Sequence, residues 1–398
     1  MSQRKIILEK VEQAIGILRE KDVDVWLTFV RETSQLNDPS MSLIVSPDLQ
    51  MTWHSAFMLT KRGERIAIVG RYDADNIKQT GAYKEVIGYD QSIRQPLVEV
   101  FKRLDPGCIA INYSESDPSA DGLTHGMWTQ LFRLLDGTPY ASRFISSESV
   151  IAALRGRKSK SEVDRVRAAV KDTQAIFDEV TAFLRPGLKE TEIRDFIHDR
   201  MVDRGLTTAW ETEFCPIVNA HPNSPIVHGA PGDFKTERGH TLHIDFGVSK
   251  DGFVSDLQHM WYFLDKGETK PPADVQQGFD AVRGAIVAAS KELKPGALGW
   301  EVDKAARAFV VKAGFPEYQH ATGHHVGRTA HDGATVLGPR WERYGDTVEG
   351  EIEVGNIFTL ELGVEVPNRG YIGLEEDVLV TATGLDWLSK PQTQIDCI

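Results

Sequence analysis

Hydrophobic and polar positions in the first part of the chain alternate between the helical and the strand period. Within residues 1–20 the apolar positions recur at helical spacing, at Ile7, Val11, Ala14 (or Ile15) and Leu18. Short β-rich runs follow at residues 23–30, 66–69 and 109–113. Turn signals such as Asp105-Pro106-Gly107 separate these runs. Helical stretches that alternate with short strands predict an α/β domain for residues 1–155.

A strong helix start opens the second part of the chain. Ser159 and Glu162 have the spacing of a capping box, and apolar residues at helical spacing follow until Pro186-Gly187 ends the helix. We expect the basic stretch at residues 155–160 to be a solvated linker. The domain boundary is therefore placed near residue 155, and residues 156–398 are predicted to form a second domain.

The second domain carries a faint internal repeat. Leu184-Arg185-Pro186-Gly187 recurs 109 residues later as Leu293-Lys294-Pro295-Gly296, and Gly205 recurs at the same offset as Gly314. In each half, two helices and a glycine precede a strand that ends in a carboxylate-x-Gly triplet, namely Asp245-Phe246-Gly247 and Glu361-Leu362-Gly363. Two points at one offset indicate a duplicated unit.

Composition and charge narrow the classes of partner. A length of 398 residues is enough for two to three domains. The 45 basic and 58 acidic residues give a net charge of −13, which repels nucleic acid and anionic membrane surfaces. No apolar run approaches a membrane span, and the three cysteines form no Cys-x-x-Cys pair. We therefore expect a cytoplasmic protein with neither nucleic acid nor membrane as a partner.

Histidines and carboxylates gather in the second domain. Nine of the twelve histidines lie within 111 residues. In the same region, Asp245 and Glu361 follow apolar runs that are typical of buried strands. An ionised carboxylate in a buried strand is costly unless it is paired or binds a cation.

Turn signals indicate that each of these carboxylates has a partner on an adjacent strand. Asp-Gly at residues 251–252 predicts a hairpin that places Asp256 almost opposite Asp245. A second turn, Pro367-Asn368-Arg369-Gly370, would bring Glu375 near Glu361 in the same way.

Four converging carboxylates would need cations between them. Oxygen-rich ligation with one imidazole suits divalent manganese, cobalt or zinc. The candidate imidazole is His324, because Gly323 and Gly327 beside it permit close backbone approach. Taken singly, these residues also fit an ordinary turn, a solvated acidic corner or a loop cap. Together they favour a site for two metal ions.

From about residue 150 to 385 the chain resembles the pita-bread metallopeptidases, which include methionine aminopeptidase, Xaa-Pro aminopeptidase, prolidase and the metal-free creatinase. The resemblance rests on four motifs: Asp245-Phe246-Gly247 with Asp256 eleven residues on, Gly-His-x-x-Gly at His324, Thr-x-Glu-x-Gly at Glu361, and Leu-Glu-Glu-Asp-Val-Leu-Val-Thr at Glu375. The first 150 residues resemble the N-terminal domain of the creatinase, prolidase and aminopeptidase P branch. The resemblance implies an α/β N-terminal domain followed by an α+β pita-bread catalytic domain with an internal pseudo-twofold repeat.

The resemblance also implies a ligand set. Asp245 would chelate one metal ion, His324 and Glu361 would complete the other, and Asp256 and Glu375 would bridge the pair. The cofactor would be two divalent metal ions per chain, with manganese favoured over cobalt and zinc.

Three further histidines match substrate-side positions of the family: His228, His320 and His331. By resemblance, His228 contacts the substrate near its scissile bond, His331 helps to stabilise the oxyanion, and Glu361 moves the proton from water to the leaving nitrogen. The remaining histidines of the cluster match no catalytic position and are expected to be structural: His221, His240, His243, His259 and His325.

The implied activity is hydrolysis of Xaa-Pro bonds by a dinuclear metallopeptidase, with prolidase activity favoured over Xaa-Pro aminopeptidase activity. The partner would be a small peptide with proline at P1′, and the relatives imply a homodimer.

Two positions depart from the family. Gly373 replaces an arginine that balances the acidic cluster, and Phe214 replaces a tyrosine that supports a ligand aspartate. The alternatives are a hydrolase of a small non-peptide C–N bond, as in creatinase or ectoine hydrolase, and a catalytically impaired binding protein on this scaffold.

Overall fold

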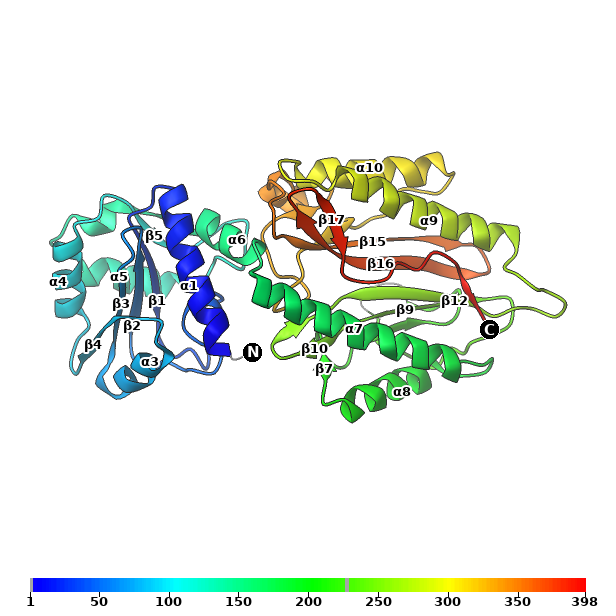
Figure 1. Ribbon diagram of the computed structural model, residues 1–398, viewed down its shortest axis with the longest axis horizontal. Coiled ribbons are helices and arrows are strands. Elements are labelled where there is room, and N and C mark those ends of the chain that lie inside the picture. The colour runs from blue at the N-terminus through cyan, green and yellow to red at the C-terminus, as the bar shows by residue number, and fades with distance from the viewer. Residues whose placement is uncertain (1–2, 226–228) are drawn as a thin grey trace. The chain divides into compact units, whose positions relative to one another are not determined.

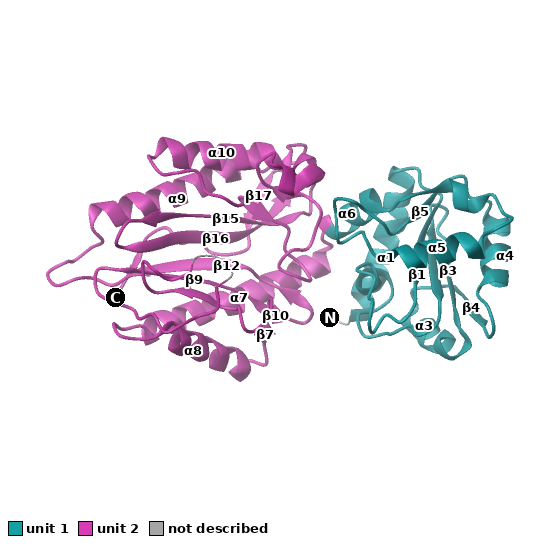
Figure 2. Cartoon of the chain, turned by 180° about the vertical axis from the view of Figure 1, so that it is seen from behind, with its two compact units in different colours: residues 1–155 teal, residues 156–398 magenta. Residues whose placement is uncertain are grey.

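The computed structural model describes residues 3–225 and 229–398 and divides into two compact units, residues 1–155 and 156–398 (Figure 2). The division falls in the last turn of α6 (Glu148–Gly156). Among the helices of the described residues, none is both long enough and apolar enough to cross a membrane.

The first unit contains a six-stranded mixed sheet in the order β4-β3-β2-β1-β5-β6 (Figure 1). Its strands are β1 (Val25–Val30), β2 (Ser55–Thr60), β3 (Arg65–Gly70), β4 (Glu85–Tyr89), β5 (Ile109–Ile111) and β6 (Phe144–Ser146). Its other helices are α1 (Gln3–Glu20), α2 (Met41–Ile44), α3 (Ala74–Thr80), α4 (Arg94–Leu104) and α5 (His125–Leu134), with short 3₁₀ turns at Arg71–Asp73 and Tyr140–Arg143. β2 pairs antiparallel with both β1 and β3, while the other pairings are parallel.

Helices cover both faces of this sheet because the strand side chains alternate. In β1, Trp26 and Val30 pack into the apolar cluster of α1 and α6, whereas Leu27 and Phe29 pack into the cluster of α4 and α5. An apolar core on each face of the sheet confirms the α/β class predicted for these residues.

The second unit is built on a larger sheet with the strand order β15-β16-β12-β9-β8, to which β17 and β18 are added at β16 and β12. Its strands are β7 (Thr207–Thr208), β8 (Ile217–Asn219), β9 (Thr241–Phe246), β10 (Val248–Lys250), β11 (Phe253–Val254), β12 (Leu257–Tyr262), β13 (Gly323–His324), β14 (Val336–Leu337), β15 (Ile357–Val366), β16 (Gly370–Thr381), β17 (Gly384–Trp387) and β18 (Asp396–Cys397). Its helices are α7 (Lys160–Phe183), α8 (Glu190–Asp203), α9 (Ala273–Glu292) and α10 (Gly299–Lys312), with 3₁₀ turns at Glu342–Glu349.

Alternate residues of the long strands face these helices. Phe358, Leu360 and Leu362 of β15 share an apolar cluster with α9 and α10, so Glu361, which lies between two of them, points to the opposite face. Figure 1 shows α9 and α10 on the side of β15 and β16, and α7 and α8 on the side of β9 and β12. The helices thus cover one face of the sheet and leave the other to the polar residues.

The start of α7 is capped as predicted, but the basic stretch before it is not a solvated linker. Ser159 and Glu162 form a capping box at the first turn. The Lys158 side chain is only 1% exposed, and its Nζ lies 2.7 Å from Oδ2 of the equally buried Asp332. Arg157 pairs with Glu353 at 2.6 Å. The expectation was wrong because these cations have carboxylate partners more than 170 residues away in the sequence.

The order of helices and strands in the second unit occurs twice. α7 and α8 precede β9 and β12, and α9 and α10 precede β15 and β16. The glycines at corresponding turns, Gly187 and Gly296, have φ of +94° and +86°, a conformation that favours glycine. The pseudo-twofold relation between the two halves stays a prediction.

Candidate metal centre

Four polar side chains form one row across the sheet of the second unit. The register places Glu361 of β15 opposite Glu375 of β16, as the predicted turn requires. Glu375 in turn lies opposite Gln258 of β12, and Gln258 lies opposite Asp245 of β9. Because neighbouring strands are about 4.8 Å apart, successive members of this row are within contact distance.

The hairpin between β9 and β12 turns at Asp251-Gly252, as predicted. Both residues have positive φ, 52° and 77°, which is the conformation of a type I′ turn. The register differs from the expectation by two residues, because Gln258 and not Asp256 is the partner of Asp245. Asp256 still shares the face of the row, since side chains along a strand alternate with a period of two.

His324 reaches the row from β13, which runs beside β15. A Cβ on Gly323 would lie 2.1 Å from the carbonyl oxygen of Thr359, so only glycine allows this approach. Nε2 of His324 lies 3.4 Å from Oε1 of Glu361, 3.9 Å from Oδ2 of Asp256 and 4.0 Å from Oε1 of Glu375. The structure thus brings three of the four predicted carboxylate ligands around the imidazole nitrogen of the fifth ligand.

The electrostatics of the row follow from its burial. Burial raises the pKa of Asp245, Asp256 and Glu375 well above the usual range, and the carboxylates raise one another's pKa further. Burial also acts on Glu361, but hydrogen bonding and charge from His324, together with the charges of nearby histidines, lower its pKa below the usual value. Without cations these carboxyl groups compete for protons.

Divalent cations fit this donor set. Oδ1 of Asp245 is buried and has no hydrogen-bond partner among the described residues. Donor atoms of Asp256, His324 and Glu375 all lie within 4.8 Å of one another. Buried carboxylate oxygens with one imidazole are ligands that manganese, cobalt and zinc accept. The residues present are therefore able to hold metal ions in place of protons.

Two of the predicted substrate histidines, His320 and His331, lie within the described residues. The His331 ring is 4.2 Å from the His324 ring, measured between centroids. Nδ1 of His320 lies 2.7 Å from the carbonyl oxygen of Ala321, and its charge contributes to the low pKa of Glu361. His228 lies outside the described residues.

Sequence reasoning gave no role at the site to three buried polar residues, and it expected one of them, His243, to be structural. Gln258 lies between the carboxylates, His243 contacts Gln258, and Asp377 accepts a hydrogen bond from the backbone nitrogen of Asp256 at 3.2 Å. Each stands two residues from a predicted ligand on the same strand or its extension. Strand alternation was therefore a signal that could have placed them on the same face.

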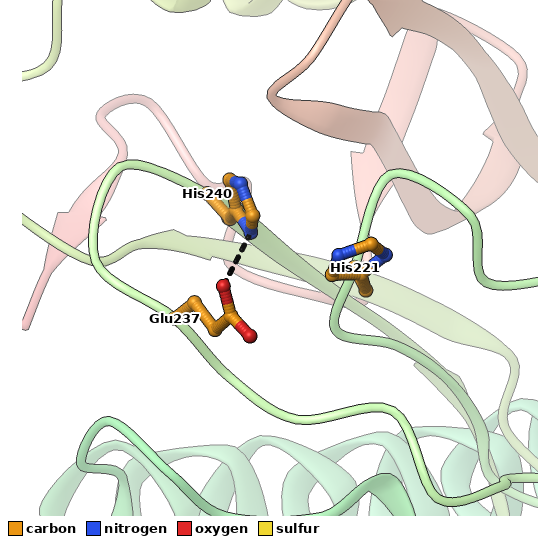
Figure 3. Close-up of side chains that lie close together, drawn as sticks. All are labelled: His221, Glu237 and His240. Carbon is orange, nitrogen blue, oxygen red and sulfur yellow. Dashed lines mark ion pairs between the residues drawn. The ribbon is translucent and has the colours of Figure 1, made fainter.

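The other unassigned histidines lie away from the row. His221, Glu237 and His240 have donor atoms within 4.8 Å of one another (Figure 3). Within this group, His240 directly precedes β9 and stands five residues before Asp245, which is roughly 16 Å along an extended chain. His259 pairs with Asp396, and His325 packs against Phe358.

The two departures from the family pattern have different surroundings. A Cβ on Gly373 would lie 2.7 Å from Oε1 of Gln258 and 2.8 Å from Nε2 of His243, so these two side chains fill the space beside the glycine. Phe214 is 37% exposed, and its aromatic ring has no hydroxyl to offer to a ligand aspartate.

Comparisons with known proteins find peptidases over most of the chain. A model of metallopeptidase family M24 matches residues 164–382. An uncharacterized peptidase of Staphylococcus saprophyticus is 25% identical over 386 residues, which cover 96% of this chain and 99% of that protein.

Solved structures share the fold over nearly the whole chain. A Xaa-Pro dipeptidase from Bacillus anthracis has a TM-score of 0.74 at 22% identity and covers 98% of this chain and 100% of its own. The dipeptidase PepE from Mycobacterium ulcerans has a TM-score of 0.76 at 21% identity and covers 100% of this chain and 99% of its own. An X-Pro aminopeptidase from Thermotoga maritima has a TM-score of 0.71 at 21% identity and covers 98% of this chain and 99% of its own. These likenesses confirm the predicted pita-bread fold.

Proposed function

This chain belongs to metallopeptidase family M24, and from that membership we propose that it is a dinuclear peptidase that hydrolyses Xaa-Pro bonds. Dipeptides are the favoured substrates over longer peptides, and manganese is the favoured metal. The observation that carries the proposal is the buried group of carboxylates around Nε2 of His324.

The proposed ligands divide between two ions. Asp245 would hold one ion, His324 and Glu361 would hold the other, and Asp256 and Glu375 would be shared. The enclosed and unpartnered Oδ1 of Asp245 supports this division, since it offers a lone pair that no other described residue uses. The raised pKa values of Asp245, Asp256 and Glu375 support it as well, because cations would stabilise the ionised forms.

The chemistry of the site divides between the ions and the side chains. When bound, a pair of divalent ions lowers the pKa of water toward neutrality and polarises a carbonyl oxygen. Glu361 has a pKa below the usual value, so it is ionised and ready to accept a proton from the attacking water. It then passes the proton to the leaving nitrogen. His331, beside His324, donates to the oxygen that becomes negatively charged.

The substrate class rests on the solved structures that share this fold. Two of them are named as a Xaa-Pro dipeptidase and an X-Pro aminopeptidase. We assign the proline ring to the P1′ side and contact with the peptide to His228 and His320.

A metal titration tests the proposal. Metal-free protein receives manganese, cobalt or zinc, and hydrolysis of Ala-Pro, Gly-Pro and a longer Xaa-Pro peptide is measured. We expect manganese to restore hydrolysis most strongly, and the dipeptides to react faster than the longer peptide. Absence of hydrolysis with every metal would contradict the peptidase function. Faster cleavage of the longer peptide would make the protein an aminopeptidase.

A further inference from the structure

Gln258 occupies the centre of the carboxylate row without being a ligand in the proposed set. Its side chain is 8% exposed, and its register partners are Glu375 on one side and Asp245 on the other. Nε2 of Gln258 lies 3.1 Å from Oε2 of Glu361 and 3.1 Å from Oε2 of Glu375. A single amide group therefore donates to two carboxylates on adjacent strands.

The two hydrogen bonds determine which oxygen each carboxylate presents. Oε2 of both Glu361 and Glu375 accepts from Gln258. Oε1 of each faces Nε2 of His324, at 3.4 Å and 4.0 Å respectively. A carboxylate with one oxygen tied in this way cannot rotate freely about its last side-chain bond, so Oε1 stays directed at the position of a cation.

The amide orientation of Gln258 is itself fixed. An amide nitrogen has two hydrogens, and the two glutamates use both. The amide oxygen lies 2.9 Å from Nε2 of His243 and accepts a hydrogen bond from it in the tautomer that carries the ring hydrogen on Nε2. A flipped Gln258 amide would place an oxygen against two carboxylates, which is unfavourable.

Glycine at position 373 makes room for this arrangement. A Cβ there would approach both Oε1 of Gln258 and Nε2 of His243 to less than 3.0 Å, and it would approach the Tyr371 ring to 2.7 Å. Any side chain at residue 373 would therefore displace the amide from the glutamates.

We propose that Gln258 is a positioning residue that holds Glu361 and Glu375 for metal binding and turnover, with His243 fixing its orientation and Gly373 giving it space. The inference rests on the function proposed above and adds residues that the ligand set does not contain. Hydrogen-bonding partners of metal ligands contribute about 10- to 100-fold to metal affinity or activity.

The test compares two buried glutamines. Gln258→Met keeps the length of the side chain and removes the amide. Gln392→Met is the matched control, because Gln392 is also 8% exposed and its amide makes two hydrogen bonds, both to the backbone of Met260. We expect Gln258→Met to weaken manganese binding about 10- to 100-fold and to lower kcat with little change in KM at saturating metal. Gln392→Met should change neither manganese binding nor kcat. Both variants should lose thermal stability.

A second variant disturbs the Gln258 amide by a change at Gly373. Gly373→Ala adds only a methyl group, leaves all five proposed ligands in place and should reproduce the loss of manganese affinity. The inference is overturned if Gln258→Met and Gly373→Ala both bind manganese as tightly as the wild-type chain. A wild-type chain that binds no manganese would overturn the proposed function as well, so the two failures are distinguishable.

Discussion

Individual residues on β16 show how one strand separates two environments. Glu375 belongs to the row of carboxylates, whereas the next residue, Glu376, points to the opposite face. There its carboxylate accepts hydrogen bonds from the Ser389 hydroxyl at 2.7 Å and from the Gln392 backbone nitrogen at 3.0 Å. Nη1 of Arg283 on α9 lies 3.5 Å from Oε1 of Glu376. Two adjacent glutamates in the same strand therefore have different chemistry, and only one of them faces the candidate metal centre.

The burial of Glu376 predicts a dependence of stability on pH. Burial raises the pKa of Glu376 to about 7, although its hydrogen bonds and Arg283 oppose this. The folded state thus holds a proton that the unfolded state loses near pH 4.5. The contribution of protonated Glu376 to the free energy of unfolding is complete below pH 4.5 and is lost as the pH rises through about 7. The total loss is about 3 kcal/mol.

Glu376→Gln removes this titration. We expect the variant to gain stability relative to the wild-type chain as the pH is raised from 4.5 to 7.5, as measured by denaturant unfolding at several pH values. A constant difference in stability across this range would show that Glu376 does not titrate there.

At the scale of elements, the start of α7 holds the loop that carries His331. Lys158 and Asp332 form a buried ion pair, and Oδ2 of Asp332 also accepts from the backbone nitrogen of Arg328 at 3.1 Å. A Cβ on Gly327 would lie 2.0 Å from Oδ2 of Asp332, so glycine is required where the loop crosses the pair. The ion pair thus joins a helix start to the loop of His331, which lies far from it in the sequence.

Lys158→Met should destabilise the second unit, because it leaves Asp332 buried without its cation. Breaking a buried pair in this way costs about 3–5 kcal/mol. Turnover should also fall, since the loop of His331 loses its anchor. The control is Lys160→Met, whose side chain is 88% exposed and pairs with Asp164 on the helix surface. That change should cost less than about 1 kcal/mol. Equal unfolding midpoints for the two variants would contradict this account.

Sequence patterns predicted the turns better than the register and the long-range pairs. The Asp251-Gly252 turn was predictable because both residues favour positive φ. The pairing of Asp245 with Gln258 was not, because a turn signal does not fix the register that packing selects. Lys158 was mistaken for a solvated residue because its partner, Asp332, is close in space but far away in the sequence.

At the scale of the whole molecule, the second unit brings distant segments of an acidic chain to one place. Asp245 and Glu375 are 130 residues apart in sequence, yet only Gln258 lies between them in the row. The net charge of −13 makes such a gathering of buried carboxylates unfavourable without compensation. The fold provides the imidazole of His324 and the amide of Gln258 to the cluster, and cations would supply the remaining charge.

The most direct test of this account is anomalous X-ray scattering from crystals grown with manganese, on the wild-type chain and on Asp256→Ala. We predict two manganese ions among Asp245, Asp256, His324, Glu361 and Glu375 in the wild-type chain, and loss of both ions when the shared carboxylate Asp256 is removed. Wild-type crystals without manganese at these residues, or an Asp256→Ala variant that keeps two ions, would contradict the account.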